Sequence, residues 1–255
     1  GFHILATGLR VWGEDAPDWD AFTRHGSRKL VIWDSPDLVT WSAPRYVSVA
    51  PATFGMAWAP TVPWDEATGD YLVFFSGTVY AEHDADHAST SEAAVHVTRT
   101  RDFRTFTDPE LYLSMPTGVI DLVVVPDGGT VHVLAKHDDR DPETLAVFHQ
   151  VRTSIFDPMP VTVATHIGAQ FGDHVEGPLL FKEPGTNRWY CWVDRYGRSA
   201  QGFQALTSTD PASGQWKAVT AGDFHIPLAT KHGSVLPLAR SEWEALQSRF
   251  GPAAE

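Results

Sequence analysis

The sequence has little of what most common functional sites require. Its 255 residues include a single cysteine, Cys191, so no intramolecular disulfide can form. No stretch approaches the ~18 consecutive apolar residues of a membrane-spanning helix, and we expect no membrane partner. There is also no glycine-rich phosphate loop, no Cys/His spacing suited to zinc and no Gly-x-Ser-x-Gly elbow. These absences argue against nucleotide-binding loops, metal sites of the zinc type and serine-hydrolase triads.

Positive charge is scarce as well. The chain has 19 Lys and Arg against 32 Asp and Glu, which gives a formal net charge of −13. A negative surface repels phosphate backbones, so nucleic acid is not an expected partner. The sequence shows no signal peptide, and both a secreted and a cytoplasmic location stay open. It opens on residues 1–8 as if in the middle of a strand hairpin, so we expect upstream sequence to be missing.

Aromatic residues and internal repeats are plentiful. One unit consists of a short apolar run, a turn and a second apolar strand. It recurs at residues 59–76, 120–135 and 176–193, with a partial copy at 232–238. The similar spacing predicts one blade of a β-propeller for each copy. Cys191 falls in the second strand of its copy, where we expect it to be buried.

A second repeat predicts the turns between the outer two strands of each blade. It occurs as Ser35–Trp41 and Thr100–Phe106, and more loosely as Ser208–Trp216. The aromatic residue that ends each copy is expected to pack back on its blade. Residues 2–7 match a second strand whose first strand is absent.

These repeats predict an all-β fold with one domain over residues 1–255, a five-bladed β-propeller. Its first blade is incomplete at the N-terminus, and the segment from 232 is the closing strand. Residues 241–246 are expected to form a short C-terminal helix, because Ser241 and Glu244 have capping-box spacing.

The innermost strand of each blade lines the central channel, so polar residues that begin these strands should converge on one pocket. Three of them begin at Asp121, Glu176 and His232, and Trp58 precedes the fourth. Two carboxylates in a pocket rimmed by aromatic rings suit glycoside hydrolysis. A like charge such as Asp121 would raise the pKa of Glu176 and keep it protonated as the acid.

In these stretches the chain resembles glycoside hydrolase family 43, five-bladed propeller enzymes acting on arabinose- and xylose-containing plant polysaccharides. The matching segments are Ala57–Pro60, Val119–Asp121, Glu176–Leu179 followed by Lys182, Val193–Gly197 and Lys231–Val235. The resemblance implies an inverting glycosidase of the arabinofuranosidase or xylosidase type. No cofactor is required.

The same resemblance implies a role for each channel residue. Glu176 is expected to be the general acid, Asp121 the residue that tunes its pKa, and His232 a channel histidine holding a water or Ca²⁺. The general-base Asp of the family would lie in the first strand of the first blade, before residue 1. The nearby acidic residues are weak substitutes; they are Glu14, Asp15, Asp18 and Asp20.

Four residues are candidates for binding the carbohydrate. Trp58 could stack on a sugar ring, although a tryptophan there could equally belong to the core. Arg195 and Tyr196 lie where a turn at the pocket rim is expected, and His232 lies on the pocket floor. A non-catalytic or degenerate carbohydrate-binding propeller is the alternative function, and a transferase related to the fructan-acting propellers is a third.

Overall fold

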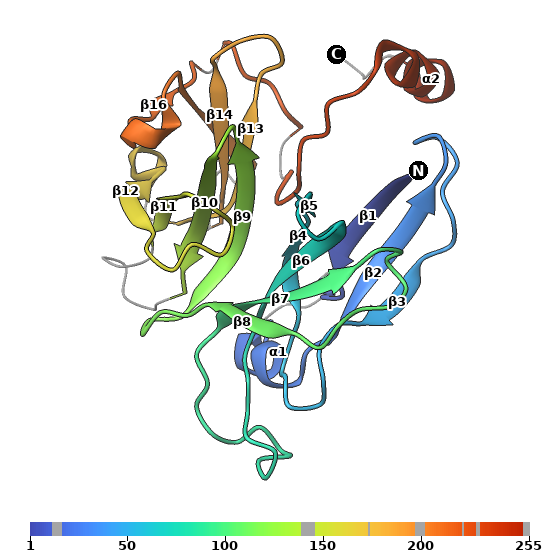
Figure 1. Cartoon of the computed structure of the whole chain (residues 1–255), viewed down its shortest axis with the longest axis vertical. Helices are drawn as coiled ribbons and strands as arrows, with labels where there is room; N and C mark the ends of the chain where they lie inside the picture. The colour runs from blue at the N-terminus through green and yellow to red at the C-terminus, as the bar shows by residue number, and fades with distance from the viewer. Residues whose placement is uncertain are drawn as a thin grey trace.

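The structure of the chain is a computed structural model that describes residues 1–11, 17–138, 146–172, 174–196, 202–220, 222–227 and 230–251. The described residues form four antiparallel β-sheets arranged around a centre, with two short α-helices (Figure 1). The all-β propeller class is therefore as predicted. Over these residues, neither helix is both long and apolar enough to cross a lipid bilayer.

Each sheet follows the chain from the inside outward. The first contains β1 (Phe2–Thr7), β2 (Lys29–Ser35) and β3 (Arg45–Ser48). The second contains β4 (Trp58–Thr61), β5 (Trp64–Asp65), β6 (Asp70–Gly77), β7 (Ala94–Thr100) and β8 (Glu110–Leu113). The third contains β9 (Val119–Asp127), β10 (Thr130–His137), β11 (Val147–Arg152) and β12 (Val161–Ile167). The fourth contains β13 (Val175–Lys182), β14 (Trp189–Arg195), β15 (Gly202–Ser208) and β16 (Lys217–Ala218).

Alternation along the second strand of each blade holds neighbouring sheets together. In β6, Leu72 and Phe74 face the third sheet, whereas Val73 and Phe75 face the first. Successive strand residues point to opposite faces, so a strand that is apolar on both faces can be buried between two sheets. All four of these side chains are buried. Cys191 of β14 is completely buried in the same kind of layer, as predicted.

The predicted five blades are not confirmed. The described part of the chain forms four sheets, and residues 232–238, expected as a closing strand, contain no strand. Val235 and Leu236, whose apolar side chains would face a sheet in such a strand, are 41% and 55% exposed. Without a sheet to pack on, the segment instead returns to the centre beside β13 and continues to α2 (Arg240–Phe250) (Figure 1).

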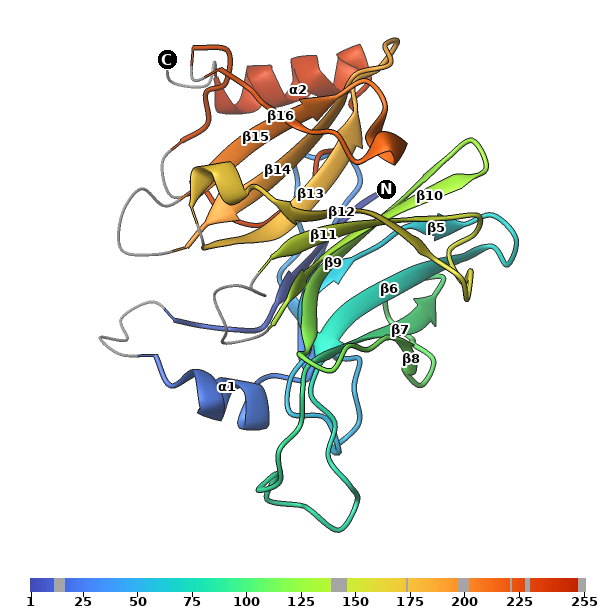
Figure 2. The ribbon, with the colours of Figure 1, turned by 90° about the vertical axis from the view of Figure 1, so that its left-hand side faces the viewer.

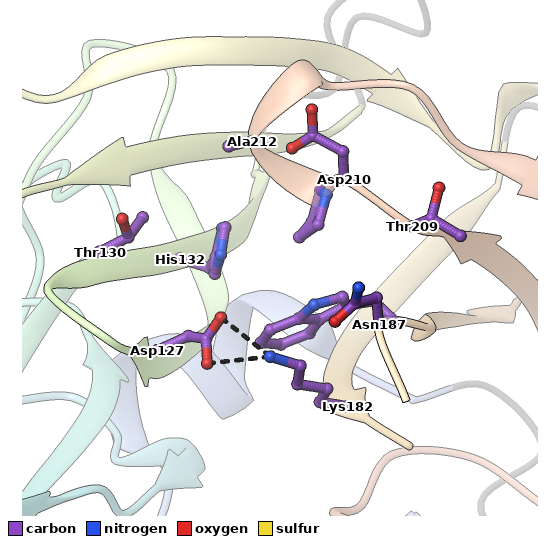
Figure 3. Close-up of a pocket in the computed structure, with 10 residues that line it drawn as sticks. Asp127, Thr130, His132, Lys182, Asn187, Thr209, Asp210 and Ala212 are labelled. Atoms are coloured by element: carbon purple, nitrogen blue, oxygen red, sulfur yellow. Dashed lines mark hydrogen bonds and ion pairs between the residues drawn. The ribbon is translucent and has the colours of Figure 1, made fainter. Parts of the chain in front are cut away.

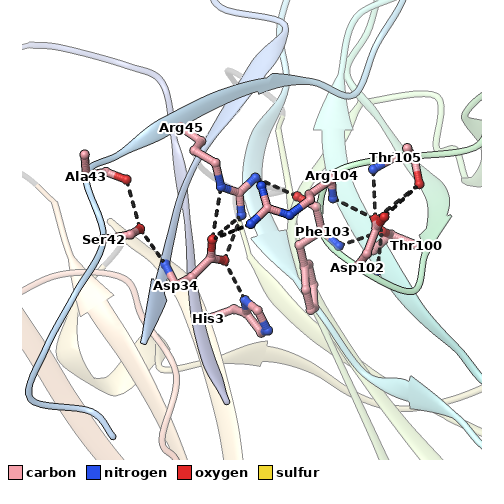
Figure 4. Close-up of polar contacts among 10 residues, drawn as sticks. All are labelled: His3, Asp34, Ser42, Ala43, Arg45, Thr100, Asp102, Phe103, Arg104 and Thr105. Atoms are coloured by element: carbon pink, nitrogen blue, oxygen red, sulfur yellow. Dashed lines mark hydrogen bonds and ion pairs between the residues drawn. The ribbon is translucent and has the colours of Figure 1, made fainter. Parts of the chain in front are cut away.

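The outer-strand turns have the predicted position. Asp102 accepts hydrogen bonds from the Arg104 and Thr105 amides at 2.8 and 2.9 Å, and Phe103 takes a φ of 54° (Figure 4). Arg45 of β3 donates to the Phe103 carbonyl at 2.9 Å, which ties the first sheet to this turn of the second. The repeat thus serves structure, as expected.

The two helices lie toward opposite ends of the longest axis of the molecule (Figures 1 and 2). The C-terminal helix is present as α2, but its cap differs from the prediction. The Glu242 carboxylate accepts from the Ala239 amide at 2.7 Å, and Glu244 instead pairs with Arg240 at 2.8 Å. Ser241 therefore lies inside the helix. The other helix, α1 (Trp19–His25), was not predicted.

Candidate functional site

The inner strands β4, β9 and β13 lie side by side around the centre, and each contains a bulge near its start. The bulge residues are Ala59, Asp121 and Gly177, with φ values of 48°, 55° and 53°. His232 has the same kind of conformation, with a φ of 43°. Asp121 and His232 are thus equivalent in the repeat. Glu176 was expected at the same position, but that position is taken by Gly177, and Glu176 lies one residue before it.

A hydrogen bond across each junction between sheets fixes these bulges. The amide of Ala59 donates to Thr7 Oγ1 at 2.9 Å, and the amide of Asp121 donates to Ser76 Oγ at 3.2 Å. The amide of His232 donates to Asp194 Oδ2 at 3.0 Å. In these three junctions the acceptor is the last or the next-to-last residue of a strand in the preceding sheet, namely β1, β6 or β14.

The remaining junction, before Gly177, has a lysine at that position. Lys136 of β10 pairs with Ile120, as Ser76 pairs with Trp58 and Asp194 with Glu176. An ammonium group has no lone pair to offer, so it cannot accept an amide hydrogen.

A carboxylate from the inner strand takes the place of the missing acceptor. The Gly177 amide donates to Asp121 Oδ2 at 3.0 Å. Gly177 has no room for a side chain, because an added Cβ would lie 2.5 Å from Asp194 Oδ2 and 2.9 Å from His232 Nδ1. The bulge that follows Glu176 is therefore fixed by Asp121 and requires glycine.

Glu176 itself is surrounded by positive charge. Lys231 Nζ lies 2.8 Å from its Oε1, and His232 Nε2 lies 3.6 Å from the same oxygen. Lys136 Nζ lies 3.7 Å from Oε2. The Lys136 ammonium group also lies 4.7 Å from the ring centre of Tyr196. Each carboxylate oxygen of Glu176 thus faces a lysine.

Asp194 links the segment after residue 230 to the fourth sheet. Its side chain is completely buried, and Lys231 Nζ lies 3.3 Å from Oδ1. His232 Nε2 lies 3.5 Å from Oδ2, in addition to the backbone hydrogen bond from His232. Lys231 and His232 therefore connect this segment to the site by their contacts with Asp194 and Glu176.

These charges set the pKa of Glu176 in the direction opposite to the prediction. Burial would raise it, but His232, Lys136 and Lys231 together outweigh burial and hold the pKa at about 2. The expectation that Asp121 keeps Glu176 protonated is therefore wrong for the site without substrate, because the three cations around the carboxylate outweigh its burial. Glu176 is ionised here at neutral pH.

Several neighbouring groups have pKa values shifted upward, among them Asp138 and His232. Burial raises the pKa of Asp138, and the charges of Asp121, Glu92 and Glu176 add to it, so that it reaches about 6 despite Lys136. Burial lowers the pKa of His232, but Glu176, Asp121 and Asp194 raise it to about 9. His232 is thus a cation at neutral pH. The pKa of Asp138 lies close to neutral pH.

One oxygen or nitrogen atom from each of Asp121, Glu176 and His232 lies within 4.8 Å of the others. The prediction that these three converge is confirmed. They do not fit a Ca²⁺ site, because Ca²⁺ takes six to eight oxygen ligands and two lysines already face Glu176. We therefore assign no metal to this group.

The predicted substrate-binding residues fall in different places. Trp58 begins β4 and is equivalent in register to Glu176 of β13. It is partly buried and packs against Met56, Ala93 and Ile120. Tyr196 contacts Lys136 directly, whereas the Arg195 side chain lies beside Gly172.

Two of the four substitute bases, Asp18 and Asp20, are engaged at α1. Asp18 accepts the Ala21 amide as the cap of α1 at 3.0 Å, and Asp20 pairs with Arg24 at 2.8 Å. Glu14 and Asp15 lie outside the described residues.

Sequence reasoning missed Lys136 and Asp194 as site residues and treated Lys231 only as part of a motif. A signal for the first two exists. Thr7, Ser76, Lys136 and Asp194 each lie near the end of an apolar strand. The register makes the last three equivalent, and Thr7 accepts the amide of Ala59 as Ser76 accepts that of Asp121. A comparison of these four polar residues would have shown that Lys136 is the one that cannot accept a hydrogen bond.

A cavity of about 270 Å³ lies between the third and fourth sheets, at the end away from Glu176 (Figure 3). Asp127, at the end of β9, and Lys182, at the end of β13, form an ion pair at 3.3 Å across it. Trp189 lines it but is 3% exposed, so it offers no open ring face to a sugar. This cavity lacks the converging carboxylates of the Glu176 site.

Residues 1–244 match the model of a glycoside hydrolase family 43-related family, described as a probable glycosyl hydrolase domain. The chain belongs to this family. The family resemblance predicted from the motifs is thereby confirmed. This glycosyl hydrolase domain is 27% identical over 149 residues to an α-L-arabinofuranosidase of Bifidobacterium longum subsp. longum. That match covers 54% of the domain and 14% of the relative, so the chain spans only a small part of it.

Solved structures show the same fold class for the glycosyl hydrolase domain. The native arabinanase of Bacillus subtilis has a TM-score of 0.54 at 15% identity, over 86% of this chain and 76% of that one. A GH62 α-L-arabinofuranosidase of Coprinopsis cinerea has a TM-score of 0.54 at 16% identity, over 76% and 61%. At such identities the likeness establishes the propeller fold alone.

Proposed function

We propose that this domain hydrolyses glycosidic bonds in arabinose-containing oligosaccharides or polysaccharides, with inversion and with Glu176 as the general acid. The observation that carries the proposal is the gathering of Glu176, Asp121 and His232 at the propeller centre. Arabinose is favoured over xylose because relatives in sequence and in structure are named as α-L-arabinofuranosidases and an arabinanase.

In the proposed reaction, the proton of Glu176 passes to the glycosidic oxygen as the bond from that oxygen to the anomeric carbon breaks. A water molecule bonds to the anomeric carbon from the opposite face and gives its proton to a carboxylate base. The two carboxyl groups of an inverting pair stand ~6.5–9.5 Å apart to leave room for this water. Asp121 is too close to Glu176 for that, within 4.8 Å, and it holds the Gly177 amide. Asp121 therefore acts on Glu176, not on the water.

Glu176 must gain a proton before it can serve as the acid. Lys231 belongs to a segment without strand pairing and contacts Oε1 directly. A leaving-group oxygen placed against Oε1 displaces the Lys231 ammonium group. Loss of that cation, together with exclusion of water by the sugar, raises the pKa of Glu176. Trp58, Tyr196 and His232 are the proposed contacts to the substrate.

A non-catalytic carbohydrate-binding propeller is the second candidate. The low pKa of Glu176 favours it, because an ionised carboxylate cannot donate a proton. Asp18 and Asp20, two of the substitute bases, are engaged at α1, which points the same way. In this case the pocket binds the sugar without turnover.

Activity of Glu176→Gln on aryl α-L-arabinofuranosides and aryl β-xylosides separates the candidates. We expect kcat to fall by ~10²–10⁴-fold, the usual effect of losing a general acid. Glu183→Gln is the matched control, since Glu183 is at the surface and pairs only weakly with Arg188 at 3.6 Å. An unchanged kcat in Glu176→Gln sinks the assignment of the acid. Binding of arabino-oligosaccharides by the unmodified protein without hydrolysis supports the second candidate, and the anomer first released tests inversion.

A further inference from the structure

We propose that Lys136 is a positioning residue, which holds the Glu176 carboxylate from the neighbouring sheet in place of the junction hydrogen bond made elsewhere. The inference deepens the proposed function and depends on it only where activity is the measurement.

The first support is the single break in the repeat. Thr7, Ser76 and Asp194 each accept the bulge amide of the next inner segment. Lys136 occupies the same position and cannot do so. A hydroxyl group would complete this junction with a shorter side chain, as Ser76 does one sheet earlier. A junction built for stability alone therefore has no need of lysine.

The second support is the burial of Lys136. Its side chain is 6% exposed, and burying an ammonium group is unfavourable unless it is compensated. Compensation comes from the nearby charge of Asp121, from the ring of Tyr196 at 4.7 Å and from the carboxylate of Glu176 at 3.7 Å, which is the ion pair that crosses the junction. The lysine is thus aimed across the junction at the one residue that the proposed chemistry requires.

The third support is the fate of the displaced hydrogen bond. Asp121 accepts the Gly177 amide and thereby fixes the bulge that directly follows Glu176. The replacement of an acceptor by a donor at Lys136 thus leaves two contacts converging on Glu176. Lys136 holds its carboxylate, and Asp121 holds its backbone.

Other charged and titratable groups face this pair, and the test must separate Lys136 from them. They are Asp121 on β9, Asp138 after β10, Glu92 before β7, Asp194 on β14, Tyr196 after β14, and Lys231 and His232 on the segment after residue 230.

The first experiment compares stability with turnover in two variants. Lys136→Thr supplies the hydroxyl that Thr7 provides at the equivalent position, and Lys136→Met keeps the length of the side chain without its charge. We expect Lys136→Thr to keep the Tm of the unmodified protein, while kcat on an aryl arabinofuranoside falls ~10²-fold at nearly constant KM. Lys136→Arg should recover part of kcat. Lys182→Met, the same change at the exposed ion pair, should leave both quantities unchanged.

The second experiment needs no activity. The pKa of Glu176 is measured by ¹³C NMR in Lys231→Met, where loss of the closer lysine brings it into an accessible range, with the signal assigned from Glu176→Gln. Adding Lys136→Met should raise it further by about 1 or more, since an opposite charge within ~4–6 Å lowers a carboxyl pKa by 1–3.

An identical pKa with and without Lys136, or wild-type kcat in both Lys136→Met and Lys136→Thr, overturns the proposal. If the unmodified protein has no turnover at all, the proposed function fails, and the NMR comparison still decides the role of Lys136.

Discussion

The third and fourth sheets carry an ion pair at each end of their interface, and the two pairs differ in their burial. At one end, Lys182 and Asp127 lie 3.3 Å apart with side chains 38% and 40% exposed. At the other end, Lys136 and Glu176 lie 3.7 Å apart with side chains 6% and 17% exposed. An exposed pair contributes ~0–1 kcal/mol to stability, whereas desolvating each buried ion costs several kcal/mol.

This difference shows where the fold departs from what stability favours. Replacing a buried ion pair by apolar residues is often neutral or stabilising by ~1–4 kcal/mol. The exposed end resembles an ordinary protein surface. The buried end also contains Asp194, which is completely buried, and Lys231, which is partly buried, and this increases the number of charges taken from water. A role in binding or catalysis accounts for that concentration, and stability does not.

The largest effect that we expect is on Asp194. Asp194→Ala leaves the His232 backbone amide without its acceptor, and it removes one of the two carboxylate partners of Lys231, which keeps Glu176. The free energy of unfolding should fall by ~3–5 kcal/mol, as for other buried pairs that lose one partner. Urea denaturation measures it. Asp127→Ala is the matched change at the exposed end, and equal losses in the two variants would show that burial does not distinguish the two ends.

A smaller effect should separate Asp138 from ordinary carboxyl groups. Its pKa is raised, chiefly by burial, from 3.8 to about 6. The folded protein therefore keeps a proton that the unfolded chain releases, and stability falls as the pH rises from about 4 to 6. Asp138→Asn removes this dependence. At pH 8 it should be more stable than the unmodified protein by ~1–3 kcal/mol, and at pH 3.5 the two should agree.

Urea denaturation at several pH values tests the Asp138 prediction. Parallel stability curves for Asp138→Asn and the unmodified protein would mean that Asp138 is solvated like a surface carboxyl group. Asp138 would then not belong to the buried charges at the Glu176 end of the interface.

The smallest effect should come from Lys182. Lys182→Met breaks the exposed pair with Asp127 and should change the free energy of unfolding by less than ~1 kcal/mol. The small difference should shrink further in 0.5 M salt, because surface charges are screened. A loss of 3 kcal/mol or more would contradict the contrast between the two ends.

Much of this organisation could be predicted from the sequence. The strand repeats gave the propeller class, and the polar residues at the inner strands correctly brought Asp121, Glu176 and His232 together. The one-residue offset of Glu176 could not be predicted, because a bulge shifts the register without changing the apolar pattern.

Other features depend on contacts between distant parts of the chain. In the sequence, a lysine near the end of an apolar strand looks like a surface residue. The burial of Lys136 depends on its contacts with Tyr196 and Glu176, which come from a later part of the chain. Five blades were expected because residues 232–238 share the apolar pattern of an inner strand. That pattern does not say whether a partner strand is present, and in this structure Val235 and Leu236 remain largely exposed.

Lys231 lies 55 residues after Glu176 in the chain, yet it makes the shortest contact to that carboxylate. During synthesis the strands of all four sheets therefore leave the ribosome before the cation that completes the charge balance at their centre. Domains generally fold as units during synthesis, so the last segment to be made can limit the completion of a site. For a nascent chain that ends between Asp194 and Lys231, the propeller centre carries Asp121, Glu176 and Asp194 against Lys136 alone. The domain acquires its balanced site as one of the last events of its own biogenesis.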